Sequence, residues 1–482
     1  MIHSSRTPLV GPLSGLPTWL LSSPSQQLLS GALLCGCCCV LLRPWLRVLF
    51  GQAKGPITTA RGGHSGGGGA SRNINNHNII PSPRTSAALR AMTQAERDAI
   101  PYPPEGALPG ARDVPTPYGS VRVYEWGPED GERALLIAGI STPTVSLGDL
   151  AWEMSERGYR VMLFDYFGRG YSDAPADAEY GARLYVTQIL LVLASSQLGG
   201  WERFHLVGYS LGGCLAVAFA RHFPHLVESL TLIAGAGLIR PRHVDWKGWL
   251  LYQSGLLPEA LVKWIVCRRI RPSTTPSSTD VMAAESRSSH HQTQDQHTGG
   301  DADGGQGFDS APISRRRPGT SVADVVAHQI DTHAGFVHAF ASTMRHAPIY
   351  APQGDWVVLR ELLSRARRRN GQRQTTTTMK KAIFTTDSSQ EAAKYETNGG
   401  NTSNLQLAEE GEEREEVGLV KGKVLLILGS EDPVIVPEET IEDAEAVLGR
   451  EGVEYAVLAA GHELPITQSG EVADVMQAFF QP

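Results

Sequence analysis

The sequence predicts an α/β protein built around a mostly parallel β-sheet, and two kinds of segment indicate this class. Nearly unbroken apolar runs are expected of parallel strands buried on both faces, and they occur at residues 134–137, 160–164, 204–207, 230–233 and 424–428. Stretches of helical character lie between several of them, at residues 148–157, 185–198 and 214–222. Short strands that alternate with helices favour a sheet with helices on its two faces. Residues 120–126 alternate in polarity after a Tyr118-Gly119 turn and are expected to form an early hairpin strand.

The pentapeptide Gly208-Tyr209-Ser210-Leu211-Gly212 joins the apolar run 204–207 directly to the helix-like stretch 214–222. A strand that reverses into a helix within a few residues leaves no room for side chains beside the turn, which explains the two glycines. A serine at the centre of such a turn is held in a strained conformation with its hydroxyl exposed at the top of the sheet. The pattern therefore predicts a nucleophilic Ser210.

A nucleophilic serine needs a base, and the base needs an acid that orients it. Asp432 follows the apolar run 424–428, and His462 follows a further short strand at 455–458. Both therefore lie past the carboxyl ends of predicted strands, where open α/β sheets place their active sites. The order serine, acid, histidine is the one found with this type of turn. Glu431 is the neighbouring alternative for the acid.

Acyl transfer passes through an oxyanion, which requires hydrogen-bond donors already in place. The backbone N–H of Leu211 lies at the predicted N-terminus of a helix, where the dipole also favours negative charge. We expect the second N–H to be that of Ile140, in the loop 138–142 that follows the apolar run 134–137.

Together with the segment 165–173, Asp-Tyr-Phe-Gly-Arg-Gly-Tyr-Ser-Asp, these features make the chain resemble the α/β-hydrolase superfamily, in its lid-bearing branch of small esterases, lipases and carbon–carbon bond hydrolases. The resemblance covers residues 93–270, 321–368 and 417–482. It implies a mostly parallel sheet of about eight strands, helices on both faces and an inserted helical lid, and it favours Asp432 as the acid. The family usually has His-Gly where this chain has Ala138-Gly139.

The predicted organisation divides the chain into five parts, of which two form the core that carries the predicted sheet. These parts are a leader with an apolar segment and a flexible linker (1–91), the first part of the core (92–240), a helical lid (241–368), a disordered linker (369–420) and the C-terminal part of the core (421–482). Within the lid, residues 273–320 are predicted to be disordered, because they are too poor in apolar side chains to offset chain entropy. The same reasoning applies to the linker.

Several aromatic and histidine residues of the predicted lid have more than one interpretation. The aromatic side chains form the core of the lid or line a pocket for an apolar acyl group, and they are Trp246, Trp249, Trp264, Phe336 and Phe340. Three histidines lie five residues apart on a predicted helix over 322–344, a spacing that does not place metal ligands on one face, and they are His328, His333 and His338. No metal site and no cofactor are expected.

The leader contains an apolar run at residues 28–42, which is shorter than the roughly 20 residues that span a bilayer. Three interpretations remain open: a membrane anchor with nearby arginines and cysteines, an acid-poor transit peptide for an organelle, or a leader that does not belong to the protein. Under the last, the protein starts at Met92 and is cytoplasmic.

Composition limits the function further. The chain has 482 residues and a formal net charge of −7, which gives no electrostatic reason to expect a nucleic-acid partner.

The sequence predicts a serine hydrolase that cleaves lipid or small apolar acyl esters through an acyl-enzyme. Thioester, lactone and carbon–carbon bond hydrolysis are alternatives, and a non-catalytic ligand-binding protein on the same fold is the alternative from another class. The oligomeric state is not predicted.

Overall fold

The computed structural model describes residues 78–243, 246–272, 305–350, 353–386 and 418–481. The chain divides into two compact units, and the elements considered below belong to the larger one, Asn73–Gln253 together with Leu257–Pro482.

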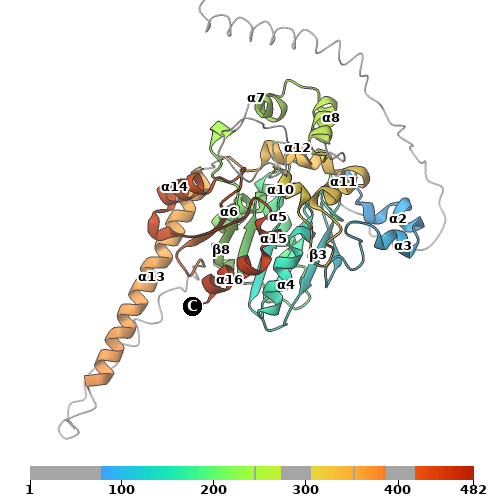
Figure 1. Cartoon of the computed structure of the whole chain (residues 1–482). Coiled ribbons are helices and arrows are strands. Elements are labelled where there is room, and N and C mark those ends of the chain that lie inside the picture. The colour runs from blue at the N-terminus through green and yellow to red at the C-terminus, as the bar shows by residue number, and fades with distance from the viewer. Residues whose placement is uncertain (1–77, 244–245, 273–304, 351–352, 387–417, 482) are drawn as a thin grey trace, which may run out of the picture. The chain divides into compact units, whose positions relative to one another are not determined.

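An eight-stranded sheet forms the centre of this unit (Figure 1). In spatial order its strands are β10 (Val453–Leu458), β9 (Val424–Gly429), β8 (Val227–Ile233), β7 (Phe204–Tyr209), β4 (Arg133–Ile137), β5 (Arg160–Phe164), β3 (Gly119–Trp126) and β2 (Arg112–Thr116). The six strands from β10 to β5 run parallel, whereas β3 is antiparallel to both β5 and β2. The predicted fold class is confirmed: the sheet has eight strands, is mostly parallel and carries helices on both faces.

Helices cover the two faces of the sheet, as strands buried on both faces require. On one face α4 (Gly148–Glu156) packs against α16 (Ser469–Phe480), and on the other α6 (Leu211–His222) lies between α5 (Ala182–Leu193) and the N-terminal part of α13 (Gln353–Thr386). Further along, α14 (Pro437–Leu448) packs against α13. The strands β4, β7 and β9 contribute side chains that are almost all buried.

The segment between β8 and β9 is here called the insertion, and its helices follow one another before the chain returns to the sheet. In the described residues they are η5 (Pro241–His243), α7 (Trp246–Gly248), η6 (Trp249–Gln253), α8 (Glu259–Ile270), α10 (Gly305–Ser310), α11 (Val322–Thr332), α12 (Phe336–His346) and α13. Figure 1 shows α11 and α12 next to the sheet and α7 and α8 on the outer side of α12. The single helix expected over 322–344 is wrong: it breaks at His333, which adopts an extended ψ of 96°.

The predicted limits of the disordered tracts also require correction. Residues 305–320 are ordered, because Phe308 and Ile313 are buried and the hydroxyl of Ser314 donates to Asp149 of α4 at 2.7 Å. Helix α13 continues to Thr386 rather than ending near 368. Its first turns bury apolar side chains at helical spacing, Trp356, Leu359, Leu363 and Ala366. The remainder of both tracts, 273–304 and 387–417, lies outside the described residues.

The ordered domain begins before Met92, contrary to the prediction of a flexible linker up to residue 91. Strand β1 (Ile79–Ile80) pairs antiparallel with β6 (Ala174–Pro175), and the N–H of Ser82 donates to Asp173 at 2.7 Å. Helices α2 (Ala87–Ala91) and α3 (Gln94–Asp98) follow. The apolar run 28–42 lies outside the described residues. Among the residues that are described, none of the helices has the length and apolar character needed to cross a membrane.

Candidate active site

Ser210 occupies a sharp turn between β7, which ends at Tyr209, and α6, which begins at Leu211. Its φ of 51° and ψ of −119° lie in a region that side-chain-bearing residues rarely adopt. A Cβ at Gly208 would clash with the backbone of Gly212, and one at Gly212 would lie 2.8 Å from the carbonyl oxygen of Ala138. The two glycines are therefore required by close backbone approach, as the sequence pattern predicted.

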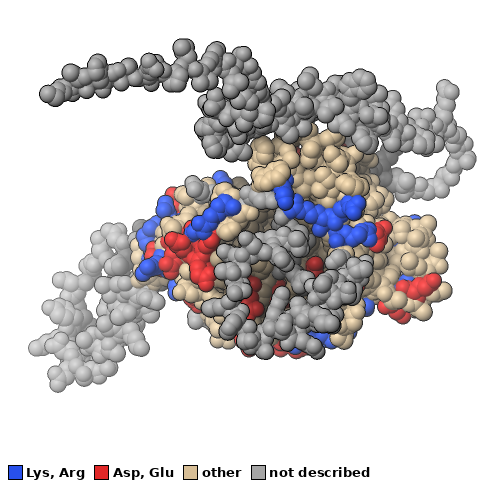
Figure 2. All heavy atoms as spheres, turned by 45° about the horizontal axis from the view of Figure 1, so that its top comes forward, with Lys and Arg blue, Asp and Glu red and all other residues tan. Residues whose placement is uncertain are grey.

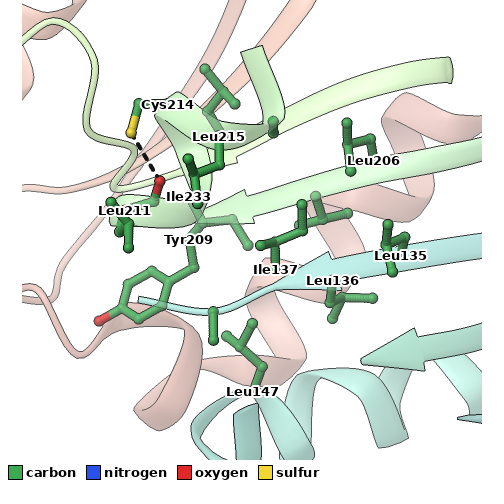
Figure 3. Close-up of a cluster of buried hydrophobic side chains, with 14 of the residues drawn as sticks. Leu135, Leu136, Ile137, Leu147, Leu206, Tyr209, Leu211, Cys214, Leu215 and Ile233 are labelled. Carbon is green, nitrogen blue, oxygen red and sulfur yellow. Dashed lines mark hydrogen bonds between the residues drawn. The ribbon is translucent and has the colours of Figure 1, made fainter. Parts of the chain in front are cut away.

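The backbone around Ser210 is held by hydrogen bonds from several directions. Its N–H donates to Ile233 at the end of β8 (3.0 Å), and its carbonyl accepts from Gly213 (2.9 Å) and Ala236 (2.8 Å). Figure 3 shows the apolar cluster that surrounds this turn, with side chains from β4, β7, β8 and α6. Such over-determination is what allows a strained φ and ψ to persist.

The structure brings Ser210, His462 and Asp432 together in one chain of hydrogen bonds. Nε2 of His462 lies 3.0 Å from the Ser210 hydroxyl, and Nδ1 of His462 lies 2.8 Å from one Asp432 oxygen. His462 and Asp432 are buried, whereas Ser210 is partly exposed. The neighbouring Glu431 is exposed.

Backbone and side-chain donors fix the orientation of the acid and the base. The second Asp432 oxygen accepts from the N–H groups of Val434 (2.8 Å) and Ile435 (2.9 Å). The hydroxyl of Tyr209 donates to the carbonyl of His462 at 2.7 Å. Phe308 of α10 lies beside the imidazole, with ring centroids 5.7 Å apart. One side of the His462 ring therefore faces a residue from the insertion.

Two backbone amides near Ser210 are available as donors. Within the described parts of the chain, neither the N–H of Leu211 nor that of Ile140 donates to a backbone acceptor outside regular secondary structure. Leu211 is the first residue of α6, and Figure 3 shows it beside Tyr209. The loop that contains Ile140 approaches the serine closely, since a Cβ at Gly139 would lie 3.5 Å from Cβ of Ser210.

Three buried side chains hold three carbonyl groups of this loop. The hydroxyl of Tyr166 donates to Ala138 (2.9 Å), Nε of Arg169 donates to Ile140 (2.9 Å), and Nε2 of Gln329 donates to Ser141 (2.8 Å). Arg169 and Gln329 are fully buried. Sequence reasoning missed the role of Gln329, and no local signal could have found it, because the residue lies on α11, far along the chain.

Arg169 and Gln329 also connect the loop to its surroundings. The guanidinium of Arg169 donates to the Thr343 hydroxyl (3.3 Å) and lies over the Phe336 ring, 5.6 Å from its centroid. The Gln329 side-chain oxygen accepts from the N–H of Gly170 at 3.0 Å. Because Thr343 and Phe336 belong to α12, the loop is held jointly by the sheet and the insertion.

Asp165, which directly follows β5, holds the backbone next to the loop 138–142 by hydrogen bonds. One of its oxygens accepts from the N–H of Thr144 and the other from that of Tyr171, each at 2.9 Å. Burial raises the pKa of this carboxyl to about 6, against the opposing effect of the two N–H donors. Asp165 thus anchors the start of the helical segment that follows the loop.

The histidines of α11 and α12 and of the turn between them have structural contacts. The described residues contain no group of three or more histidine, cysteine or acidic side chains placed to hold a metal ion. His333 is buried, with one ring nitrogen 2.9 Å from the Ser172 carbonyl and the other accepting from Gly335 (3.1 Å). Desolvation lowers the pKa of His333 to about 4, so this ring is neutral at pH 7.

Comparisons with known proteins match part of the chain to the alpha/beta hydrolase fold. A family model described as the alpha/beta hydrolase fold matches residues 147–265. A serine hydrolase-like protein of Danio rerio is 29% identical over 133 residues, 27% of this chain and 40% of that protein. A 2-hydroxy-6-oxo-2,4-heptadienoate hydrolase of Pseudomonas putida is 37% identical over 110 residues, 22% of this chain and 39% of that protein.

Among solved structures, a naproxen esterase from Bacillus subtilis is similar with a TM-score of 0.42 and 16% identity, over 78% of this chain and 93% of that one. The chain spans only about two fifths of the length of the curated relatives named above.

Proposed function

Because the chain belongs to the α/β-hydrolase superfamily, we propose that it is a serine hydrolase that cleaves carboxylic esters of lipids or small apolar acyl groups. The observation that carries the proposal is the continuous chain from Asp432 through His462 to Ser210, with distances of 2.8 and 3.0 Å. A serine joined to a base that is itself oriented by an acid is the arrangement that nucleophilic catalysis needs.

The reaction proceeds in two halves. His462 takes the proton of the Ser210 hydroxyl through Nε2 while the serine oxygen attacks the ester carbonyl carbon. The tetrahedral intermediate collapses, the alkoxide leaves with that proton, and an acyl-Ser210 remains. His462 then removes a proton from water, which attacks the acyl group and releases the acid. Asp432 keeps Nδ1–H of the imidazole directed toward itself and stabilises the imidazolium that forms in each half.

The N–H groups of Leu211 and Ile140 are the proposed donors to the oxyanion. Both are free of backbone acceptors in the described structure, and Leu211 adds the dipole of α6. Arg169 and Gln329 are proposed as positioning residues, because they fix the carbonyls of Ile140 and Ser141 and so the direction of the Ile140 peptide. The loop that they hold begins with Ala138, at the position where the family usually has histidine.

A carbon–carbon bond hydrolase is the second candidate. The similarity to the Pseudomonas putida 2-hydroxy-6-oxo-2,4-heptadienoate hydrolase favours it, although the match covers only 39% of that protein. Thioester and lactone hydrolysis use the same three residues and are separated from ester hydrolysis only by substrate. A non-catalytic binding protein would not need a base within 3.0 Å of the serine.

Substitutions in the full chain test the mechanism. Ser210→Ala and His462→Ala should each lower kcat for p-nitrophenyl esters by roughly 10⁴- to 10⁶-fold, because the three residues act as one unit. Asp432→Asn should lower it by about 10⁴-fold through the wrong tautomer. The matched control is Glu431→Gln, which removes the adjacent exposed carboxylate and should leave the rate unchanged.

A fluorophosphonate probe separates catalysis from binding. It should label the unaltered protein at Ser210 and leave Ser210→Ala unlabelled. An unlabelled wild-type protein, or ester hydrolysis that survives in folded Ser210→Ala, would reject the mechanism. A series of p-nitrophenyl esters of increasing acyl length, with a thioester, a lactone and a vinylogous 1,5-diketone beside it, then assigns the substrate class.

A further inference from the structure

The outermost part of the insertion exposes an unusual number of large apolar side chains. Trp246 is 69% exposed, Trp249 54% and Trp264 56%, and Leu261 is 39% exposed. We call these four residues the tryptophan patch. The expectation that the three tryptophans form lid core or line a pocket is wrong, whereas Phe336 and Phe340 are fully buried. Isolated exposed apolar residues need no explanation, but four of them on consecutive elements, of which η6 and α8 pack on the same helix, α12, indicate an interaction surface.

The exposure follows from how α8 packs. Its residues Val262, Val266 and Ile270 are buried at a spacing of four and face the protein, where α8 contacts α12. Leu261 and Trp264 lie three apart and belong to the opposite side of the same helix. Helix α8 therefore has apolar residues on two sides, but only the side with Val262, Val266 and Ile270 packs against the protein.

Residues 246–253, which form α7 and η6, also bury one set of apolar side chains and expose another. Leu251 and Tyr252 are buried, and η6 also contacts α12, while Trp249 and the preceding Trp246 remain outside. Two consecutive elements of the insertion therefore use α12 as their common support and direct tryptophans away from it.

Charge identifies the kind of partner. Residues 246–271 contain five cationic side chains and one acidic one, a net charge of +4 in a chain whose net charge is −7. The acid, Glu259, is paired with Arg345 of α12 at 2.9 Å, and one of the five cations, Arg271, is paired with Asp331 of α11. The guanidinium of Arg268 lies over the Trp264 ring, 5.2 Å from its centroid. Figure 2 shows Lys and Arg side chains bordering the uncharged surface in this region.

We propose that the tryptophan patch docks on an anionic lipid surface, with its rings at the level of the headgroups and the exposed Lys247 and Arg268 facing the anionic lipids. Tryptophan favours this depth because its ring is apolar and its N–H is polar. Lys and Arg gain from the negative surface potential, and together with Trp and Leu they form the composition of helices that lie in the interface. The inference concerns binding without substrate, so it stands or falls separately from the proposed ester hydrolysis.

Docking at this surface would place the lipid on the side of α12 where α8 and η6 pack. Phe336 and Thr343 of the same helix contact Arg169. One helix thus separates the lipid-facing tryptophans from the side chain that holds the Ile140 carbonyl.

Flotation of the full chain with vesicles tests the proposal. The protein should float with vesicles of phosphatidylcholine and phosphatidylserine, and less with phosphatidylcholine alone. Replacing Trp246, Trp249 and Trp264 together by serine should weaken association with the anionic vesicles at least about tenfold. Replacing Lys247 and Arg268 by glutamine should weaken association roughly fivefold per cation, and high salt should also weaken it.

The matched control uses exposed apolar residues elsewhere. Tyr455 and Val457 on the edge strand β10 are 51% and 44% exposed, and their replacement by serine should leave vesicle association unchanged. Circular dichroism and thermal melting check that each variant is folded.

Three results would overturn the proposal. The wild-type chain floats with neither vesicle; the triple tryptophan variant floats as well as wild type, which assigns binding to another segment such as 28–42; or light scattering shows that the tryptophans mediate self-association instead. Quenching of tryptophan fluorescence by brominated acyl chains is an independent measurement: it should occur in the wild-type chain and be reduced in the triple variant when the patch enters the interface.

Discussion

Replacing Arg169 by methionine should lower kcat for ester hydrolysis by about 10- to 100-fold, with KM changed by less than about threefold. The reason lies in where Arg169 acts. Its Nε donates to the carbonyl of Ile140, so it holds the peptide that follows the proposed oxyanion donor without touching the substrate. An interaction that matters only when negative charge develops changes kcat more than ground-state binding.

The magnitude follows from two limits. Loss of an entire oxyanion donor costs about 10²- to 10³-fold in kcat, which sets the upper bound. A hydrogen bond from a charged group contributes about 1.5–3 kcal/mol, and at 1.36 kcal/mol per decade its loss corresponds to about 10- to 100-fold. The Arg169 guanidinium is fully buried, so its removal also leaves the Ile140 carbonyl without a hydrogen-bond donor. Gln329→Met should act in the same direction through Ser141.

The assay compares kcat, KM and the rate of fluorophosphonate labelling for Arg169→Met, Arg169→Lys and wild type. The lysine variant keeps the charge and should recover part of the rate. Arg183→Met, at an exposed position of α5, is the control and should behave as wild type. A purely structural role would lower the melting temperature and leave kcat of the folded protein unchanged. That result in folded Arg169→Met would refute the reasoning.

Three further predictions concern stability and the insertion. Burial lowers the pKa of His205 from 6.5 to about 4, so the folded state binds fewer protons than the unfolded chain in this range and stability should fall as pH drops from 6.5 to 4. At 1.36 kcal/mol per pKa unit the loss is about 3 kcal/mol, and melts of His205→Gln between pH 7 and 4.5 should show a shallower decline. Gly208→Ala should reduce the free energy of unfolding by more than about 3 kcal/mol because its Cβ meets the Gly212 backbone, whereas Gly354→Ala, in open space, should be neutral by urea titration. Replacing residues 275–303 with a Gly/Ser linker should leave kcat intact, but extending the replacement to 318 should lower it at least about tenfold by removing Phe308 from beside His462; equal rates for the two deletions would contradict this.

The sequence predicted the central sheet well because each parallel strand carries its signal locally. A strand such as 424–428 is buried on both faces, so it must be apolar throughout, and no distant residue is needed to recognise it. The same holds for the turn at Ser210, since the two glycines are required by backbone atoms a few residues away. Asp432 and His462 could be found because strand ends at one edge of a sheet converge whatever the connections between them.

Local composition failed where a few apolar residues are scattered among polar ones. Phe308 and Ile313 lie in a stretch of Ser, Gly and Arg that averages as disordered, yet both side chains are buried. In the same way Ile79-Ile80 is too short to predict a strand, and it is ordered by pairing with residues 174–175. In each case the partner that provides the burial or the hydrogen bonds lies far away in the sequence, so a window of neighbouring residues does not contain the information.

The same distinction separates the reacting groups of the candidate site from the groups that hold them. Ser210, Asp432 and His462 are placed by the ends of their own strands, and their residue types alone indicate the chemistry. The loop that supplies Ile140 begins with Ala138, whose methyl group cannot order it by hydrogen bonding, so its carbonyls depend on Tyr166, Arg169 and Gln329. Gln329 belongs to the insertion, and Arg169 contacts Thr343 and Phe336 of the insertion. Variation in the insertion should therefore change the rate of the reaction through the geometry of this loop, even where it leaves the three reacting residues untouched.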